Sequence, residues 1–282
     1  MSTPTTAFVP APSTAPDDAP APVPVRTPLP SALAGTTAVL VGGSSGIGLA
    51  AGVLLRTVGA RVVLVARDPE RLRAAADRLR AVPGPAPHPA EDPVVEVPGD
   101  GGDERVLTEA FDRAGEVGHV LVTAGGVTGA GPLAALTPDG IRATLDSRLQ
   151  SAFAVARLAA ARLPAGGSLT YSSGILVTRP APGMTAPLSA AGAVETLTRA
   201  LAVELAPTRR RVNAVRFGRI DTPLWRTFPG MDSPEAVTTA GATHPLGRFG
   251  TAEEAASAAL FLMANNYMTG QILTLDGGET LT

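Results

Sequence analysis

The stretch Val39-Leu-Val-Gly-Gly-Ser-Ser-Gly-Ile-Gly48 decides the fold of this chain. An apolar run leads into a glycine-rich turn, in which Gly42, Gly46 and Gly48 follow a G-x-x-x-G-x-G spacing. Glycine permits a tight turn and lets the backbone approach a pyrophosphate, which then lies on the free N–H groups of a helix N-terminus. Any sharp strand-to-helix turn can contain glycines, but this one lies at the first strand of a strand–helix–strand pattern. The turn therefore predicts a dinucleotide-binding site.

Short apolar runs alternate with longer helical periods from Thr36 onward. Nearly continuous apolar runs are typical of parallel strands covered on both faces. The pattern predicts an α/β fold, a Rossmann-type doubly wound sheet of seven parallel strands in three layers, within a single domain over 34–282. The expected strands are 37–41, 61–66, 94–97, 119–123, 168–172, 211–215 and 271–275, and the expected helices are 47–58, 69–81, 104–114, 138–162, 189–205 and 252–264.

Two segments depart from this alternation. Residues 1–33 are rich in proline and alanine, with nine prolines among the first 30 residues. Such a segment buries too little apolar surface to offset its ordering entropy, so we expect a disordered tail, and it lacks the pattern of a secretion signal. The long stretch at about 221–243 is expected to be an irregular lid insertion, because loops of this length in compact domains often cover sites.

The composition excludes several classes of function. The chain has 282 residues, 45% of them hydrophobic, and a net charge of −2, which gives no reason to expect a nucleic-acid partner. No stretch reaches membrane-spanning length, and cysteine is absent. With only His88, His119 and His244 available, a histidine metal site is not expected. We expect a soluble, cytoplasmic protein that acts on a small molecule and binds no metal or membrane.

The basic residues are all arginine. There are 23 of them and no lysine, which excludes every lysine-dependent mechanism. A genome biased toward GC-rich codons would produce the same composition.

The second expected strand ends in Val63-Leu-Val-Ala-Arg-Asp68. An acidic residue at this strand end binds a ribose 2′-hydroxyl, whereas an arginine pairs with a 2′-phosphate. Arg67 therefore favours NADP(H) over NAD(H). Asp68 follows directly and weakens the distinction, and Arg67 could also be a solvated loop charge.

Further motifs follow in order along the chain. They are Asp100-Gly-Gly-Asp103 after the third expected strand, Val122-Thr-Ala-Gly125 after the fourth, Arg211-Val-Asn-Ala-Val-Arg-Phe-Gly-Arg-Ile-Asp-Thr-Pro-Leu224, and Thr269-Gly-Gln-Ile-Leu-Thr-Leu-Asp-Gly-Gly278. Together with the glycine turn, they resemble the short-chain dehydrogenase/reductase family from about Thr36 to Gly278. The resemblance implies a nicotinamide cofactor held by Gly42, Ser44, Ser45, Gly46, Ile47, Gly48, Arg67, Asp100, Gly101, Ala124, Gly125, Ile220 and Thr222.

The family's catalytic residues are an asparagine, a serine, a tyrosine and a lysine, and the resemblance fails at three of these four positions. Ser173 matches the serine, but Pro187 stands at the tyrosine position, Ala191 at the lysine and Arg148 at the asparagine. In the family, the tyrosine hydroxyl exchanges a proton with the reacting oxygen, and the lysine lowers the pKa of that tyrosine. Because the chain has no lysine, no other alignment restores this pair.

Two side chains could take over part of that chemistry. Arg148 could stabilise a developing oxyanion or hold a substrate carboxylate, but it could equally be an exposed helix residue. Tyr171 shares strand parity with Ser173, and it is either a substitute acid or a buried residue that packs beneath the site.

Three hypotheses follow. The first is an atypical NADP(H) oxidoreductase that reduces an iminium or conjugated enone, which needs no proton from an enzyme acid. The second is a cyclase, isomerase or dehydratase built on the old cavity, with polar groups from Ser173, Arg148, Thr185 and His244. The third is a non-catalytic cofactor-binding protein. The residues expected around a largely apolar substrate are Thr185, Pro187, Trp225 and Phe228. The resemblance also implies a homodimer or homotetramer.

Overall fold

A computed structural model describes residues 29, 31–85, 92–126 and 128–282. Most of the expected tail therefore lies outside the described residues, apart from a short 3₁₀ helix over Ser31–Leu33. Seven parallel strands form one sheet in the order β3-β2-β1-β4-β5-β6-β7. The strands are β1 (Thr37–Val41), β2 (Arg61–Ala66), β3 (Val94–Pro98), β4 (His119–Val122), β5 (Ser168–Gly174), β6 (Arg211–Phe217) and β7 (Ile272–Leu275).

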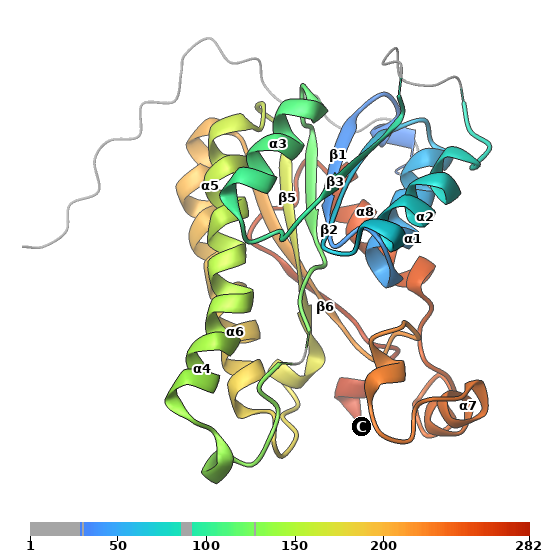
Figure 1. Cartoon of the computed structure of the whole chain (residues 1–282), viewed down its shortest axis with the longest axis vertical. Helices are drawn as coiled ribbons and strands as arrows, with labels where there is room; N and C mark the ends of the chain where they lie inside the picture. Colours follow the sequence, from blue (N-terminus) through green and yellow to red (C-terminus); the bar gives the residue numbers. More distant parts are fainter. Residues whose placement is uncertain (1–28, 30, 86–91, 127) are drawn as a thin grey trace, which may run out of the picture.

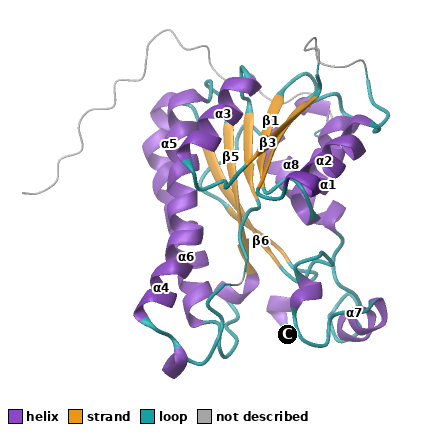
Figure 2. Ribbon diagram, viewed as in Figure 1, coloured by secondary structure: helices purple, strands orange, loops and turns teal. Residues whose placement is uncertain are grey.

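Helices cover both faces of this sheet, as Figures 1 and 2 show. Alternate residues of each strand point to opposite faces. Val39 and Val41 pack with helices on one face, and Ala38 and Leu40 pack with helices on the other. The first layer contains α3 (Glu104–Ala114), α5 (Ser151–Arg162) and α6 (Thr185–Leu205), and the second contains α1 (Gly46–Thr57), α2 (Pro69–Arg80) and α8 (Ala252–Ala264). The structure confirms the predicted three-layer α/β fold.

The expected helix at 138–162 is divided. It consists of α4 (Pro138–Leu145), a π-helical segment over Asp146–Gln150, and α5. Single π-helical turns inside α-helices are frequent at functional sites, and this one carries Arg148.

The expected irregular stretch at 221–243 is only partly irregular. It contains a short 3₁₀ helix over Trp225–Thr227 and α7 (Pro234–Gly241). The hydroxyl of Ser233 accepts a hydrogen bond from the backbone N–H of Ala236, and Pro234 occupies the first turn, where its missing N–H has no cost. Ser233 followed by Pro234 is a helix-start signal that the sequence contains.

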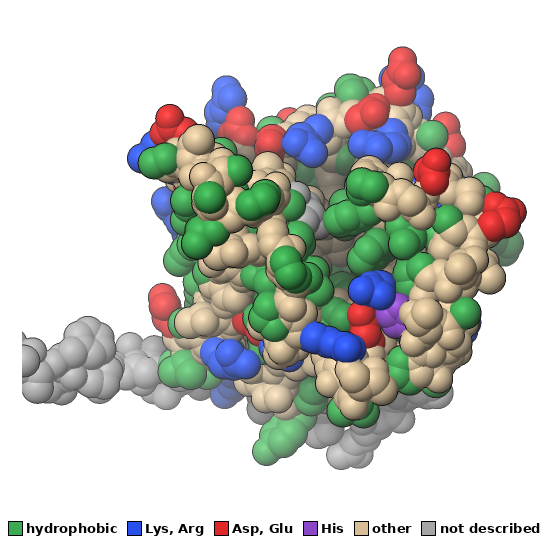
Figure 3. Space-filling model, turned by 90° about the horizontal axis from the view of Figure 1, so that it is seen from below, with side chains coloured by type: hydrophobic (Ala, Val, Ile, Leu, Met, Phe, Trp, Pro, Cys, Tyr) green, Lys and Arg blue, Asp and Glu red, His purple; other side chains and the backbone are tan. Residues whose placement is uncertain are grey.

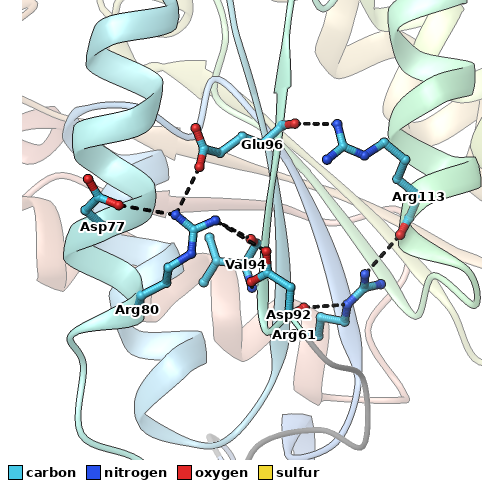
Figure 4. A network of polar contacts seen from close by, with 7 residues as sticks. All are labelled: Arg61, Asp77, Arg80, Asp92, Val94, Glu96 and Arg113. Atoms are coloured by element: carbon cyan, nitrogen blue, oxygen red, sulfur yellow. Dashed lines mark hydrogen bonds and ion pairs between the residues drawn. The ribbon is translucent and has the colours of Figure 1, made fainter.

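Arginines hold the edge strand β3 against its neighbours (Figure 4). Arg80 on α2 forms an ion pair with Glu96 at 3.0 Å and donates to the carbonyl of Val94 at 2.9 Å. Arg113 on α3 donates to the carbonyl of Glu96 at 2.7 Å. Arg61 donates to the carbonyls of Asp92 and Ala114. These contacts link the two helical layers to the outermost strand.

Within the described residues, no helix combines the length and apolar character that crossing a membrane requires.

Candidate active site

A cavity of about 440 Å³ opens where the carboxyl ends of β1, β4, β5 and β6 meet. In open α/β sheets, ligands bind beyond the carboxyl ends of the strands, where the strand order reverses. Here that reversal lies between β1 and β4. Figure 3 shows this end of the molecule hollowed in its middle, with hydrophobic side chains around the hollow. The cavity therefore lies where the fold itself predicts a ligand.

The glycine turn forms one end of the cavity, and its backbone is too crowded for side chains. Gly42 has a φ of +96°, and a Cβ placed on it would lie 2.5 Å from the backbone nitrogen of Ala124. A Cβ on Gly48 would lie 2.3 Å from the carbonyl oxygen of Gly42. Ser45, at the N-cap of α1, makes no capping hydrogen bond with its side chain, so the first N–H groups of the helix face the turn without a side-chain partner. This arrangement fits the pyrophosphate of a dinucleotide.

Many of the residues expected to hold a cofactor line this cavity. They are Gly42, Ser45, Gly46, Ile47, Gly125, Ile220 and Thr222. Ser44, Gly48, Arg67, Asp100, Gly101 and Ala124 do not line it, and their cofactor contacts stay predictions. Asp100 is exposed, and its carboxylate accepts a hydrogen bond from the backbone N–H of Gly102 at 2.8 Å.

Arg67 and Asp68, whose opposite charges argue for NADP(H) and NAD(H) respectively, have different surroundings at the end of β2. Asp68 is the N-cap of α2, and its carboxylate accepts hydrogen bonds from the backbone N–H groups of Glu70 and Arg71 at 3.1 and 3.0 Å. Arg67 is exposed and takes part in none of the ion pairs found among the described residues.

Arg148 lines the cavity from the π-helical segment. Its Nη2 donates to the carbonyl of Ser172 at 3.0 Å, and its Nη1 lies 3.2 Å from where a Cβ on Gly125 would be. Burial lowers the pKa of Arg148, and the charge of Glu195 opposes that shift. Arg148 is thus a half-buried side chain directed into the site, and the alternative of an exposed helix residue is wrong.

Ser173 also lines the cavity, and it is connected to a carboxylate that the sequence analysis did not identify. Its hydroxyl donates to Oε1 of Glu195 at 2.7 Å. Glu195 is buried on α6, and Arg216 on β6 donates to both oxygens of its carboxylate. Glu195 lies two helical turns after Pro187, so the spacing of i, i+4 and i+8 through Ala191 was the signal that could have revealed it.

Tyr171 does not reach the cavity. Its side chain is 1% exposed, and its hydroxyl donates to the backbone carbonyl of Ala152 at 2.6 Å. Burial raises the pKa of Tyr171 far above its ordinary value, which makes proton release harder. The structure corrects the suggestion of a substitute acid and supports the packing alternative. Among the described residues that line the cavity there is no tyrosine, and the chain has no lysine.

The beginning of α6 also differs from expectation. The helix starts at Thr185, four residues before the predicted start at 189, because Pro187 is still close enough to the N-terminus to be tolerated. Pro187 lines the cavity, but Thr185 does not. Thr185 is exposed, and its carbonyl accepts a hydrogen bond from the hydroxyl of Ser189, so its role at the substrate stays a prediction.

Aromatic residues of the 221–243 stretch form the outer wall. Trp225 and Phe228 both line the cavity, and their ring centroids are 5.0 Å apart. Trp225 also packs against Phe249 at 5.7 Å, and the guanidinium of Arg219 lies 5.8 Å from its ring. This wall gives the cavity its apolar character.

His244 belongs to a neighbouring cluster rather than to this cavity. Its Nε2 lies 2.8 Å from Nη1 of Arg219, and its Nδ1 lies 3.5 Å from a carboxylate oxygen of Glu279. It lines a second cavity of about 380 Å³. The structure therefore does not bring His244 together with Ser173 and Arg148.

The comparisons with known proteins agree with this geometry. The family model described as enoyl-(acyl carrier protein) reductase matches residues 41–280. The short-chain dehydrogenase/reductase malC of Malbranchea aurantiaca is 31% identical, over 88% of this chain and 96% of its own, and carbonyl reductase family member 4 of Danio rerio is 32% identical, over 86% and 98%.

Solved structures are similar as well. The reductase/Diels-Alderase MalC has a TM-score of 0.80 at 28% identity, covering 90% of this chain and all of its own. An NADPH-bound short-chain oxidoreductase of Pseudomonas aeruginosa PAO1, described as containing an atypical catalytic center, has a TM-score of 0.77 at 31% identity, covering 86% and 96%. With its glycine turn, its seven-stranded sheet and these relatives, the chain belongs to the short-chain dehydrogenase/reductase family of oxidoreductases, which bind nicotinamide cofactors.

Proposed function

We propose that the chain is an NADP(H)-dependent oxidoreductase that acts on a small, largely apolar organic substrate without a tyrosine–lysine proton relay. One observation carries the proposal. A single cavity joins the glycine turn to Arg148, Ser173 and an aromatic wall, and no tyrosine or lysine lines it. In this proposal Pro187 and Ala191 stand at the two catalytic positions of the family.

The cofactor side of the proposal rests on the glycine turn and on the end of β2. When bound, a nicotinamide would supply or accept a hydride. The open N-terminus of α1 would hold the pyrophosphate, and Thr222 lies beside it, because its side chain is 3.4 Å from where a Cβ on Gly46 would be. Arg67 favours the 2′-phosphate of NADP(H), because a guanidinium pairs with a phosphate and because the side chain of Arg67 is exposed, whereas Oδ1 of Asp68 caps α2.

The substrate side follows from what the remaining groups can do with protons. A simple ketone becomes an alkoxide on reduction and needs an acid beside it. A serine hydroxyl is too weak an acid for this, and a guanidinium does not release its proton at ordinary pH. A conjugated enone or an iminium accepts hydride at carbon without that acid. For an enone, Arg148 would stabilise the enolate oxygen, and water would protonate the carbon afterwards.

A second candidate is a reaction with no net redox change, such as a cyclisation in the same cavity. The observation that favours it is the apolar wall of Trp225 and Phe228, together with a relative whose structure is described as a reductase/Diels-Alderase. This candidate predicts product formation that consumes neither NADPH nor NADP⁺.

Assembly is a separate part of the proposal. We infer a homodimer or homotetramer formed through helices α5 and α6, on which Phe153 is 48% exposed and Val203 is 77% exposed. Light scattering of the protein measures its mass directly. A monomer across the accessible concentration range would contradict this inference.

The deciding experiment measures cofactor binding and turnover separately. Calorimetry with NADPH and NADH tests the binding, and loss of NADPH absorbance with cyclohex-2-enone and 3,4-dihydroisoquinoline tests the reaction. Arg148→Met should lower kcat/KM for the enone by about 10²-fold, whereas Arg142→Met on the exposed face of α4 should leave it unchanged. A protein that binds neither cofactor would end the proposal, and binding without any turnover would favour the non-redox candidate.

A further inference from the structure

A buried carboxylate lies directly behind the catalytic-serine position. Glu195 is 3% exposed, and three hydrogen bonds converge on its two oxygens. The hydroxyl of Ser173 donates to Oε1 at 2.7 Å, Nε of Arg216 donates to the same oxygen at 2.9 Å, and Nη2 of Arg216 donates to Oε2 at 2.5 Å. The ion pair raises the pKa of Arg216, so this partner keeps its charge.

The hydrogen bond fixes where the single proton of Ser173 points. A hydroxyl carries one proton and two lone pairs, whereas a carboxylate only accepts. The proton therefore lies between Ser173 and Glu195, and what remains for a ligand in the cavity is the lone pairs of the hydroxyl oxygen. In a site where serine acts on a ketone, the serine donates its proton to the carbonyl oxygen instead.

We propose that Glu195 is a positioning residue that turns Ser173 into a hydrogen-bond acceptor, so that the cavity selects ligands with an N–H group over ligands with an oxygen acceptor at the same place. The inference rests on the proposed function and names its substrate class: a nitrogen-containing compound, such as a protonated imine, whose N–H faces Ser173.

The reverse orientation of the hydroxyl is unfavourable. If Ser173 donated to a ligand carbonyl, Oε1 of Glu195 would lose a donor in a buried place, where hydrogen bonds to charged groups are strongest. Arg148 complements this arrangement, because a guanidinium only donates. The cavity thus offers one acceptor at Ser173 and donors at Arg148, and it fits a substrate that carries an N–H group and an oxygen or anionic acceptor.

The test uses two ligands of nearly the same shape. Indole presents an N–H donor where benzofuran presents an oxygen acceptor. Calorimetry or ligand-observed NMR gives the dissociation constant of each, with and without NADP⁺. One net hydrogen bond changes a dissociation constant by roughly fivefold. The unaltered protein should therefore bind indole at least about fivefold more tightly than benzofuran.

Four variants show whether Glu195 causes the preference. In Glu195→Gln the amide can donate to Ser173, which frees the serine proton for the cavity, so the ratio of the two dissociation constants should fall to about one or reverse. Ser173→Ala should also abolish the preference, and Ser173→Thr should keep it. Glu204→Gln, an exposed change on the same helix, is the matched control. A general loosening of the fold would weaken the binding of both ligands and leave the ratio of their dissociation constants unchanged.

Several outcomes would overturn the inference. They are equal or tighter binding of benzofuran by the unaltered protein, binding of neither ligand, and an unchanged ratio in Glu195→Gln. If Glu195→Gln does not fold, the unaltered protein, Ser173→Ala and Ser173→Thr still decide the matter. Because the ratio is also measured without cofactor and needs no turnover, its failure is distinguishable from a failure of the NADP(H) proposal.

Discussion

Arg67 and Asp68 are neighbours in the chain, but the structure uses their charges for different purposes. The carboxylate of Asp68 is directed at the backbone N–H groups that begin α2, while Arg67 stays exposed at the end of β2. Both of these hydrogen bonds end on Oδ1 of Asp68, and Oδ2 lies 3.9 Å from Nε of Arg71. The proposed preference for NADP(H) therefore depends on the exposed charge of Arg67.

This relationship predicts the effect of removing Arg67. Arg67→Ala should weaken NADPH binding by about tenfold or more and leave NADH binding nearly unchanged, because only NADPH carries the 2′-phosphate. Fluorescence titration with both cofactors measures the ratio. Arg73→Ala, which removes the same charge from the exposed face of α2, is the control. If the substitution weakens the binding of NADPH and NADH equally, Arg67 does not contact the 2′-phosphate.

A second prediction concerns the packing at Gly48. Because an added Cβ would lie 2.3 Å from the carbonyl of Gly42 and 2.6 Å from Oγ1 of Thr123, Gly48→Ala should push α1 away from the turn. Overpacking of this kind costs about 1–3 kcal/mol of the free energy of unfolding, and the displaced turn should bind NADPH more weakly. Thermal unfolding and cofactor titration measure the two effects. Gly131→Ala, with no atom within 4 Å of the added Cβ, should change neither.

A third prediction separates Tyr171 from the chemistry. Tyr171→Phe removes the hydrogen bond to the carbonyl of Ala152 and should cost about 1 kcal/mol, or about 2–4 °C in Tm. The rate of NADPH oxidation with cyclohex-2-enone and its pH profile should stay as they are. If Tyr171→Phe oxidises NADPH more slowly while its Tm is unchanged, the hydroxyl of Tyr171 contacts the substrate and the prediction is wrong.

The fourth prediction is a pH dependence of stability caused by His119. Burial, with a smaller effect from the charge of Arg211, lowers the pKa of His119 to about 3. In the unfolded chain this pKa is about 6.5, so below that pH the unfolded state binds a proton that the folded state does not. His119 should therefore make the free energy of unfolding fall as the pH drops from about 6.5 toward 3, by at most about 1.4 kcal/mol per pH unit.

Urea unfolding across this pH range measures the slope for the unaltered protein and for His119→Gln. The glutamine can keep a hydrogen bond to Ser168, whose hydroxyl lies 2.8 Å from Nδ1 of His119. Carboxylates titrate in both proteins, so the difference between the two slopes isolates the histidine. Parallel slopes would show that His119 is already accessible to protons in the folded state.

The sequence predicted the sheet well, because most strands are short apolar runs buried on both faces, a signal that needs no knowledge of distant contacts. Strand β7 is only partly buried. Helix α6 shows the limit of that approach. The expected start at residue 189 lay after Pro187, but the first turn of a helix tolerates proline, and α6 begins at Thr185.

The candidate site was predicted less completely, because it depends on contacts between elements. The glycine spacing identified Gly42, and the family resemblance identified Ser173 and Arg148. In the sequence, Glu195 cannot be distinguished from other polar residues on a helix. Its role depends on the contact with Arg216, which lies on β6. Likewise, strand parity placed Tyr171 on the same side as Ser173, but only the packing of α5 showed that its hydroxyl has a partner at Ala152.

The arginines around β3 have one more consequence. The carbonyls of Val94 and Glu96 lie at alternate positions of the outermost strand, and the guanidinium groups of Arg80 and Arg113 occupy them. An additional strand from another molecule would have to displace both side chains before it could form a ladder there. Arg80 and Arg113 thus block the addition of a further strand at the β3 edge of the sheet.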